Sequence, residues 1–91
     1  MLKYICEQNR IFASDDNDRF VAEITFPEIR KGVVDINHTF VDPSLRGQGI
    51  ASQLVKAAYH EIKKRGMKAV ATCPYVVDWF AMHKEYQDVL L

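Results

Sequence analysis

The sequence predicts an α+β fold, in which a mostly antiparallel, twisted sheet packs against one long central helix and a short C-terminal helix. Apolar and polar residues alternate with a period of two in residues 1–41, which is typical of half-buried strands. From residue 50 onward the apolar residues follow a helical period instead. Because 91 residues are enough for one domain and too few for two, we expect a single domain over 1–91.

The first part of the chain predicts strands joined by short turns. Residues 1–6 and 10–13 are β-like runs, and the acidic segment 14–18 is a turn, because its side chains hydrogen-bond their own backbone. Residues 20–26 alternate as a strand. We expect one face of this strand to carry its apolar side chains, Phe20, Ala22, Ile24 and Phe26.

A further strand is expected at 33–41, after a loop at 27–32. Together with the earlier strands it predicts an antiparallel meander with short connections. Its alternation predicts one face made of Val34, Ile36, His38 and Phe40, and an opposite face made of Asp35, Asn37 and Thr39.

The second half of the chain contains the predicted long helix. Lys63 to Arg65 suit the negative C-terminal end of a helix dipole, and Gly66 can adopt the left-handed conformation that ends a helix. The run 68–73 suits a buried strand, so the strand–helix–strand order predicts a parallel pair. Pro74 begins a shorter helix, and the tail 84–91 is either more helix or a docked end. The apolar stripe of the long helix comprises Ile50, Ala51, Leu54, Val55, Ala57, Ala58 and Ile62.

Composition excludes several classes of function. Twelve basic and twelve acidic side chains leave no net charge, which argues against nucleic acid as a partner. The N-terminus has no long apolar core, so we expect neither a signal peptide nor a membrane span. Cys6 and Cys73 lack metal-ligand spacing and fit a reducing cytoplasm, and we expect a monomer or weak dimer without a metal site.

The segment VDPSLRGQGIASQLV, residues 41–55, is the most informative stretch. Gly47 and Gly49 allow a sharp turn and a close backbone approach, and the helix that follows directs its free N–H groups to the same place. Arg46 adds a charged donor beside them. These residues indicate a phosphate or pyrophosphate site. The alternative is that the glycines only make a tight strand-to-helix turn.

Two motifs resemble the GNAT superfamily of N-acetyltransferases. Arg46-Gly-Gln-Gly-Ile-Ala51 resembles its Gln/Arg-x-x-Gly-x-Gly/Ala pyrophosphate loop, and residues 41–45 resemble the lead-in to that loop. The downstream segment 71–80, with His83 and the end of the chain, is similar to a compact acetyltransferase-like subgroup. The resemblance therefore covers nearly the whole chain.

The resemblance implies acetyl-CoA or coenzyme A as cosubstrate and an N-acetyltransferase that acts on an amine. It implies that the loop amides hold the coenzyme pyrophosphate and that the end of the preceding strand binds the pantetheine arm. The implied cofactor-binding residues are Thr39, Phe40, Val41, Arg46, Gly47, Gln48, Gly49, Ile50 and Ala51.

The resemblance also implies that His38 and Cys73 lie near the thioester as catalytic residues. From the residues alone, His38 is equally a satisfied core histidine, and a cysteine at the position of Cys73 is more often a small apolar filler than a reactive thiol. Three mechanisms stay open. Cys73 takes the acetyl group with His38 as base, or a bound amine attacks directly while His38 accepts its proton and Cys73 or Tyr75 protonates the thiolate. In the third, positioning alone accelerates the reaction.

A usual family member is longer and has an N-terminal strand and paired helices that roof the acceptor site, and we expect this roof to be missing or very reduced here. We therefore expect an open acceptor pocket, and an amine on a protein or peptide competes with a small molecule as acceptor. Two other functions compete with catalysis, since fold alone does not establish it. One is a non-catalytic acyl-CoA sensor or carrier, and the other is a small interaction protein.

Overall fold

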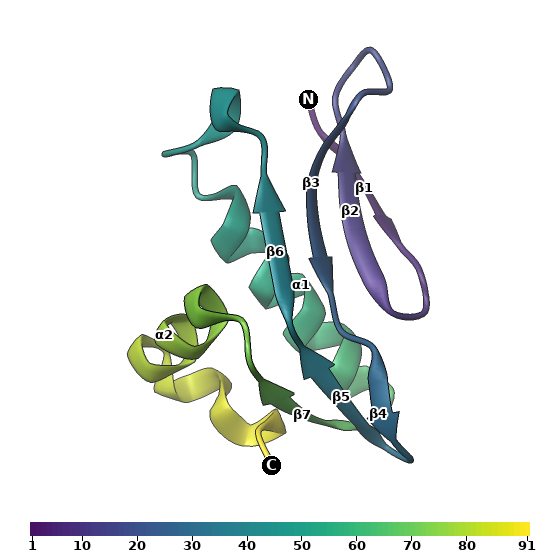
Figure 1. Ribbon diagram of the computed structural model, residues 1–91, viewed down its shortest axis with the longest axis vertical. Helices are drawn as coiled ribbons and strands as arrows, with labels where there is room; N and C mark the ends of the chain where they lie inside the picture. The colour runs from purple at the N-terminus through teal and green to yellow at the C-terminus, as the bar shows by residue number, and fades with distance from the viewer.

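The structure is a computed structural model that describes residues 1–91, and it confirms the predicted α+β class. A four-stranded and a three-stranded sheet share one core with the long helix α1 (Figure 1). The elements in chain order are β1 (Lys3–Cys6), β2 (Arg10–Ser14), β3 (Phe20–Thr25), β4 (Glu28–Arg30), β5 (Val33–Ile36), β6 (His38–Val41), η1 (Pro43–Leu45), α1 (Ile50–Lys64), β7 (Lys68–Ala71), α2 (Pro74–Met82) and η2 (Lys84–Val89).

The two sheets separate where β6 leaves β5. The first sheet has the order β1-β2-β3-β6 and is antiparallel throughout. The second has the order β4-β5-β7, and its β5–β7 pair is parallel, as the strand–helix–strand order predicts. The last contact between β5 and the chain after β7 is at Ile36, whose carbonyl accepts hydrogen bonds from the backbone N–H groups of Thr72 and Cys73. After this residue, β6 pairs with β3 alone. The other edge of β6 is therefore unpaired beside the start of α2.

The prediction of one continuous strand over 33–41 is wrong, because Asn37 interrupts it. The Asn37 N–H donates to the Thr25 carbonyl while Thr25 pairs with His38, so one extra residue is accommodated opposite Thr25. The alternation shifts by one residue. His38 and Phe40 consequently lie on the face opposite to Ile36, and Thr39 lies on the core side.

The predicted face of Phe20 is wrong for a similar reason. The register between β2 and β3 shifts so that Ala13 pairs with Ala22 but Ser14 pairs with Phe20, which leaves Val21 as the extra residue. Val21 is buried, and the Phe20 ring is 45% exposed on the other side of the sheet. The rest of the predicted β3 face, from Ala22 to Phe26, is buried as expected.

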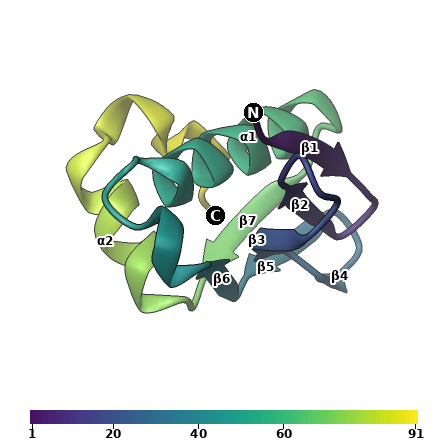
Figure 2. The same ribbon diagram turned by 90° about the horizontal axis from the view of Figure 1, so that it is seen from above.

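Helix α1 covers one face of the sheets, and α2 lies beside it (Figure 2). The helix buries the predicted stripe, including Leu54, Val55 and Ile62, against β2 and β3. It ends with the Met67 N–H donating to the Ile62 carbonyl, while Gly66 adopts φ 71°. The opposite face of the β1-β2-β3-β6 sheet carries no helix (Figure 2).

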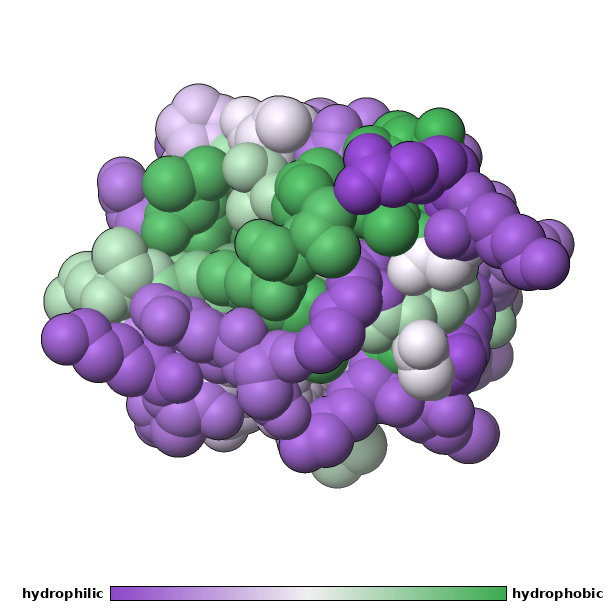
Figure 3. All heavy atoms as spheres, turned by 90° about the horizontal axis from the view of Figure 1, so that it is seen from below, coloured by the Kyte–Doolittle hydropathy of each residue, from purple (hydrophilic) through white to green (hydrophobic).

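The tail is a docked end that contains the 3₁₀ helix η2. The Tyr59 hydroxyl donates to the Asp88 carboxylate at 2.7 Å, and Leu90 forms a bridge with Ala69 at the edge of β7. Apolar residues of β7, α2 and the tail line a groove of about 410 Å³ there, and apolar side chains gather on the same end of the molecule (Figure 3). None of the helices has the length and apolar character needed to cross a membrane.

Candidate coenzyme and acyl-transfer site

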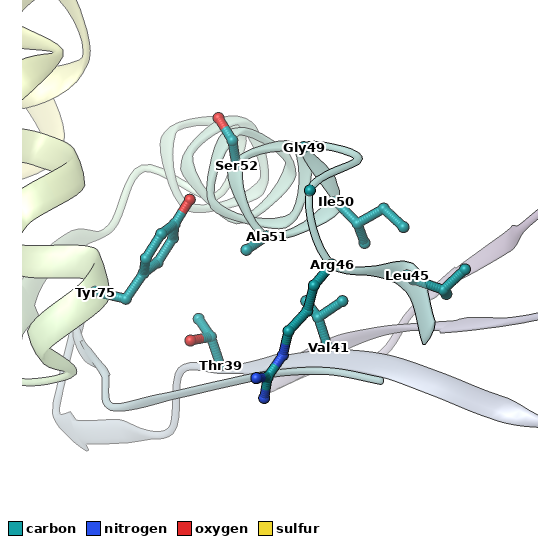
Figure 4. Close-up of a pocket in the computed structure, with 10 residues that line it drawn as sticks. Thr39, Val41, Leu45, Arg46, Gly49, Ile50, Ala51, Ser52 and Tyr75 are labelled. Atoms are coloured by element: carbon teal, nitrogen blue, oxygen red, sulfur yellow. The ribbon is translucent and has the colours of Figure 1, made fainter. Parts of the chain in front are cut away.

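A cavity of about 450 Å³ opens where β6 ends and α1 begins (Figure 4). Its floor comes from β6, its mouth from the 45–49 segment, and one wall from the first turns of α1 and α2. The lining residues are Thr39, Val41, Leu45, Arg46, Gly47, Gly49, Ile50, Ala51, Ser52 and Tyr75.

The turn before α1 depends on its two glycines. Gly47 has φ 84° and Gly49 has φ 76°, a left-handed conformation that side chains rarely adopt. Gly49 is the N-cap of α1, and the first free N–H groups of the helix follow at Ile50 and Ala51, which line the cavity. These groups and the positive end of the helix dipole favour an anion.

Arg46 supplies a positive charge at the cavity without a carboxylate partner within 4.0 Å. Its side chain extends toward the strand that carries Thr39 and Val41 (Figure 4). Its guanidinium is therefore free to donate to a phosphate.

The lead-in between β6 and Arg46 is held by Asp42. Its carboxylate accepts a hydrogen bond from Ser44 at 2.6 Å and pairs with Arg19 at 3.0 Å. The hydrogen bond from Ser44, together with the charge of Arg19, holds the pKa of Asp42 below its usual range. These contacts hold the segment between β6 and Arg46 in one position ahead of α1.

The first turn of α2 forms the remaining wall and is tied to α1. The Trp79 indole N–H donates to Ser52 Oγ at 2.8 Å, and Trp79 is 4% exposed. Tyr75 projects from α2 toward the start of α1 (Figure 4). Partial burial raises the pKa of Tyr75 above its usual value.

Cys73 lies at the junction of β7 and α2, on the core side of β6. Its Sγ is 3.5 Å from Thr39 Oγ1, so β6 and the start of α2 meet at this thiol. Burial raises the pKa of Cys73, but the Thr39 hydroxyl and nearby backbone N–H groups of Val76 and Tyr75 stabilise the thiolate, and the net effect lowers it. Cys6, in contrast, is exposed at the end of β1.

The structure does not place His38 beside the Cys73 thiol. The imidazole is 54% exposed on the outer face of β6, and its Nε2 lies 3.9 Å from Glu23 Oε1. The expectation of a core-side histidine is therefore wrong, and the catalytic role of His38 stays a prediction. His38 is nevertheless the residue directly before Thr39, which contacts the thiol.

Most of the predicted cofactor residues come together in the cavity. Phe40 and Gln48 do not line it, because the shifted alternation turns the Phe40 ring outward and Gln48 is exposed. Leu45, Ser52 and Tyr75 line it and were absent from the predicted set. Of these, Ser52 was accessible to sequence reasoning, since it follows Ala51 in the first turn of the predicted helix.

The arrangement can bind and activate a phosphate-bearing thioester. Backbone N–H groups at the start of α1 and a free guanidinium line the same cavity. A phenol lines the same cavity, and a thiol with a lowered pKa lies behind the Thr39 side chain at its floor. The free edge of β6 leaves its backbone groups available to an extended ligand.

Curated relatives share the sequence over part of their length. The chain is 38% identical to Protein NATD1 of Gallus gallus over 55 residues, which cover 60% of this chain and 50% of that protein. It is 36% identical to Protein NATD1 of Danio rerio over 72 residues, 77% of this chain and 66% of that protein. The chain thus matches about half to two thirds of the length of these relatives.

Solved structures share the fold over more of the chain. A GCN5-like protein from Staphylococcus aureus, solved by NMR, is 30% identical with a TM-score of 0.81, over 99% of this chain and 88% of that one. The GNAT family N-acetyltransferase YhbS from Escherichia coli, solved in complex with CoA, is 25% identical with a TM-score of 0.61, over 68% of this chain and 38% of that one.

A family model settles the relationship. The model described as GCN5-related N-acetyl-transferase matches residues 10–89, from the start of β2 to the end of η2. The chain therefore belongs to the GCN5-related N-acetyltransferase family.

Proposed function

We propose that the chain binds acetyl-CoA in the cavity at the start of α1 and transfers the acetyl group to an amine. The observation that carries this proposal is the junction of Gly49 and α1, where free N–H groups and the unpaired Arg46 face one cavity of about 450 Å³. The presence of CoA in the similar Escherichia coli protein supports the choice of ligand.

The two ends of the coenzyme are assigned to different elements. The amides of Arg46 to Ala51 hold the pyrophosphate, and the Arg46 guanidinium donates to the same oxygens. The backbone of Thr39, Phe40 and Val41 bonds the pantetheine arm along the unpaired edge of β6. This role needs only the backbone of Phe40, so it is compatible with the outward position of its ring.

Cys73 is the acyl acceptor of the first step in this proposal. Its thiolate attacks the acetyl carbonyl, the new C–S bond forms as the bond to the coenzyme sulfur breaks, and the coenzyme leaves as a thiolate. Tyr75 lines the cavity, so its hydroxyl donates a proton to that leaving thiolate, and the phenolate regains a proton from solvent. The nitrogen of a neutral amine then bonds to the acetyl carbon as the bond to the Cys73 sulfur breaks, and the nitrogen passes one proton to that departing sulfur. The lowered pKa of the thiol increases the fraction of thiolate that this route requires.

Two measurements test the proposal. Coenzyme A at millimolar concentration should raise the melting temperature, because a ligand that binds only the folded state stabilises it. Acetyl-CoA should then leave an acetyl adduct that intact-mass analysis finds in the wild type and in Cys6→Ala but not in Cys73→Ala.

Each negative result has a distinct meaning. No thermal shift would leave the chain as an interaction protein. Binding and turnover without an adduct would favour direct transfer, in which His38 accepts the amine proton. Binding without turnover of any amine would leave an acyl-CoA sensor or carrier.

We also propose a reducing compartment, the cytoplasm, as the site of action. Both cysteines are free thiols in the structure, and the proposed chemistry requires Cys73 to stay reduced.

A further inference from the structure

The tail (84–91) is held by side chains of α1 and by the edge of β7. The Asp88 carboxylate accepts a hydrogen bond from the Tyr59 hydroxyl at 2.7 Å and pairs with Lys63 Nζ at 2.8 Å. The Leu91 N–H donates to the Ala69 carbonyl at 2.9 Å. These contacts fix the tail on the second half of α1, away from the coenzyme cavity at its first turn.

Tyr86 connects the tail to Trp79. Its ring meets two other rings edge to face, with centroid distances of 4.8 Å to Tyr59 and 5.1 Å to Trp79. His83, between α2 and the tail, stacks on Trp79 with a centroid distance of 4.0 Å. Its Nδ1 also lies 2.7 Å from the Trp79 carbonyl oxygen. The position of the Trp79 ring therefore depends on the tail.

Trp79 reaches the coenzyme cavity through one hydrogen bond. Its indole N–H donates to Ser52 Oγ at 2.8 Å, and Ser52 lines the cavity (Figure 4). An indole N–H is a donor only, so the Ser52 hydroxyl keeps its own proton for an acceptor. Because Ser52 follows the free N–H groups of Ile50 and Ala51, a phosphate oxygen held by those groups is the acceptor that the cavity would offer.

We propose that the tail positions the coenzyme site, because Tyr86 and Asp88 hold Trp79 in the orientation in which it directs the Ser52 hydroxyl to the coenzyme phosphate. The inference rests on the proposed binding of acetyl-CoA. Tyr86 and Asp88 do not line the cavity, so they are positioning residues that act through Trp79. Release of the tail would free the indole and lower the affinity for coenzyme. Since coupling between two sites is reciprocal, coenzyme must in turn favour the docked tail.

Hydrogen exchange on the unaltered protein tests this reciprocity. The amides of Tyr86, Leu90 and Leu91 each donate a single backbone hydrogen bond, so we expect them to exchange when the tail opens locally, without global unfolding. Saturating coenzyme A should slow their exchange by about 5- to 10-fold, at the low end of usual coupling factors. The Asp18 amide, which donates to Asp15 in the turn between β2 and β3, is the control and should keep its rate.

Tail variants test the same coupling from the other side. Tyr86→Leu removes the ring that packs on Trp79 and should raise the Kd for coenzyme A in calorimetry by up to the same factor, about 5- to 10-fold. Tyr86→Phe keeps the ring and should restore the affinity. Asp88→Ala removes the partner of Tyr59 and Lys63 and should also raise the Kd. Glu85→Ala is the matched control, because Glu85 is exposed in the same segment and outside every ion pair.

The outcomes separate this inference from the proposed function. A tail that serves stability alone would lower the Tm of Tyr86→Leu and leave the Kd of its folded molecules unchanged, which overturns the inference. Coenzyme binding without slower exchange at the tail amides overturns it as well, and the coenzyme site stands. Slower exchange and a raised Kd without acetylation of any amine support the inference and overturn the transfer. Absence of coenzyme binding to the wild type overturns both.

Discussion

Gly49→Ala provides a sharp test of the anion site, because the chain offers a matched control in Gly66→Ala. The two glycines lie at opposite ends of α1, with φ 76° and φ 71°. A Cβ added at either would meet no atom within 4 Å, so the cost in both is a backbone cost. That cost is about 1–2 kcal/mol for a left-handed non-glycine residue, reduced by roughly 0.4–1 kcal/mol because alanine also restricts the unfolded chain.

Both variants should therefore lose about 1 kcal/mol of unfolding free energy, which lowers the Tm of a domain of this size by roughly 4–8 °C. Their response to coenzyme A should differ. Gly49→Ala adds a methyl group at a residue that lines the cavity, whereas Gly66 does not line it. Ligand at about 100 times its Kd stabilises the wild type by about 2.7 kcal/mol, and Gly66→Ala should retain this increment.

Differential scanning fluorimetry with and without coenzyme A measures both quantities. Gly49→Ala should lose most of the ligand-induced rise in Tm although its ligand-free Tm matches that of Gly66→Ala. Equal ligand-induced rises in the two variants would refute the assignment of the α1 N-terminus as the pyrophosphate site.

Three further predictions concern the rest of the site. Arg46→Ala should weaken coenzyme A by about 10-fold or more in calorimetry, with little change in ligand-free Tm, and an unchanged Kd would contradict its role. The alkylation rate of Cys73 should rise with pH from a lower midpoint than that of Cys6, because the lowered pKa of Cys73 populates its thiolate at lower pH. Partial desolvation of the Cys6 sulfur and the charge of Glu61 raise the pKa of Cys6 instead. Coenzyme A should slow alkylation at Cys73 alone, and equal midpoints would argue against an activated thiol. Trp79→Phe should lower the free energy of unfolding in urea by about 1 kcal/mol or more, because the hydrogen bond to Ser52 is lost. It should also weaken the binding of coenzyme A. A loss of stability without a change in affinity would show that this hydrogen bond does not shape the cavity.

The glycine turn at residues 46–51 was predictable from the sequence because its physical determinants are local. Two glycines, an arginine and the first turn of an amphipathic helix occupy consecutive positions, so the geometry of Gly49 and α1 follows from residues 46–54 alone. The parallel pairing of β5 and β7 was predictable for a similar reason, since the order of elements dictates it.

The faces of His38, Phe40 and Phe20 were not predictable from alternation. Each depends on one extra residue, Asn37 or Val21, that is accommodated only because a neighbouring strand pairs across it. A bulge reverses every later side chain in its strand, so a single misjudged position moved a histidine from the outer face to the core. Tyr75 was expected only as an alternative proton donor, and its place in the cavity wall was not predictable because it depends on how α2 packs against α1 through Trp79.

A two-dimensional ¹⁵N NMR titration with acetyl-CoA tests the central claim most directly. The account predicts saturable shifts that are largest at the amides of residues 46–51 and 39–41, with smaller changes at Cys73 and Tyr75. The amides of β4 should not move. An absence of saturable shifts at millimolar acetyl-CoA, or shifts confined to elements away from the start of α1, would contradict it.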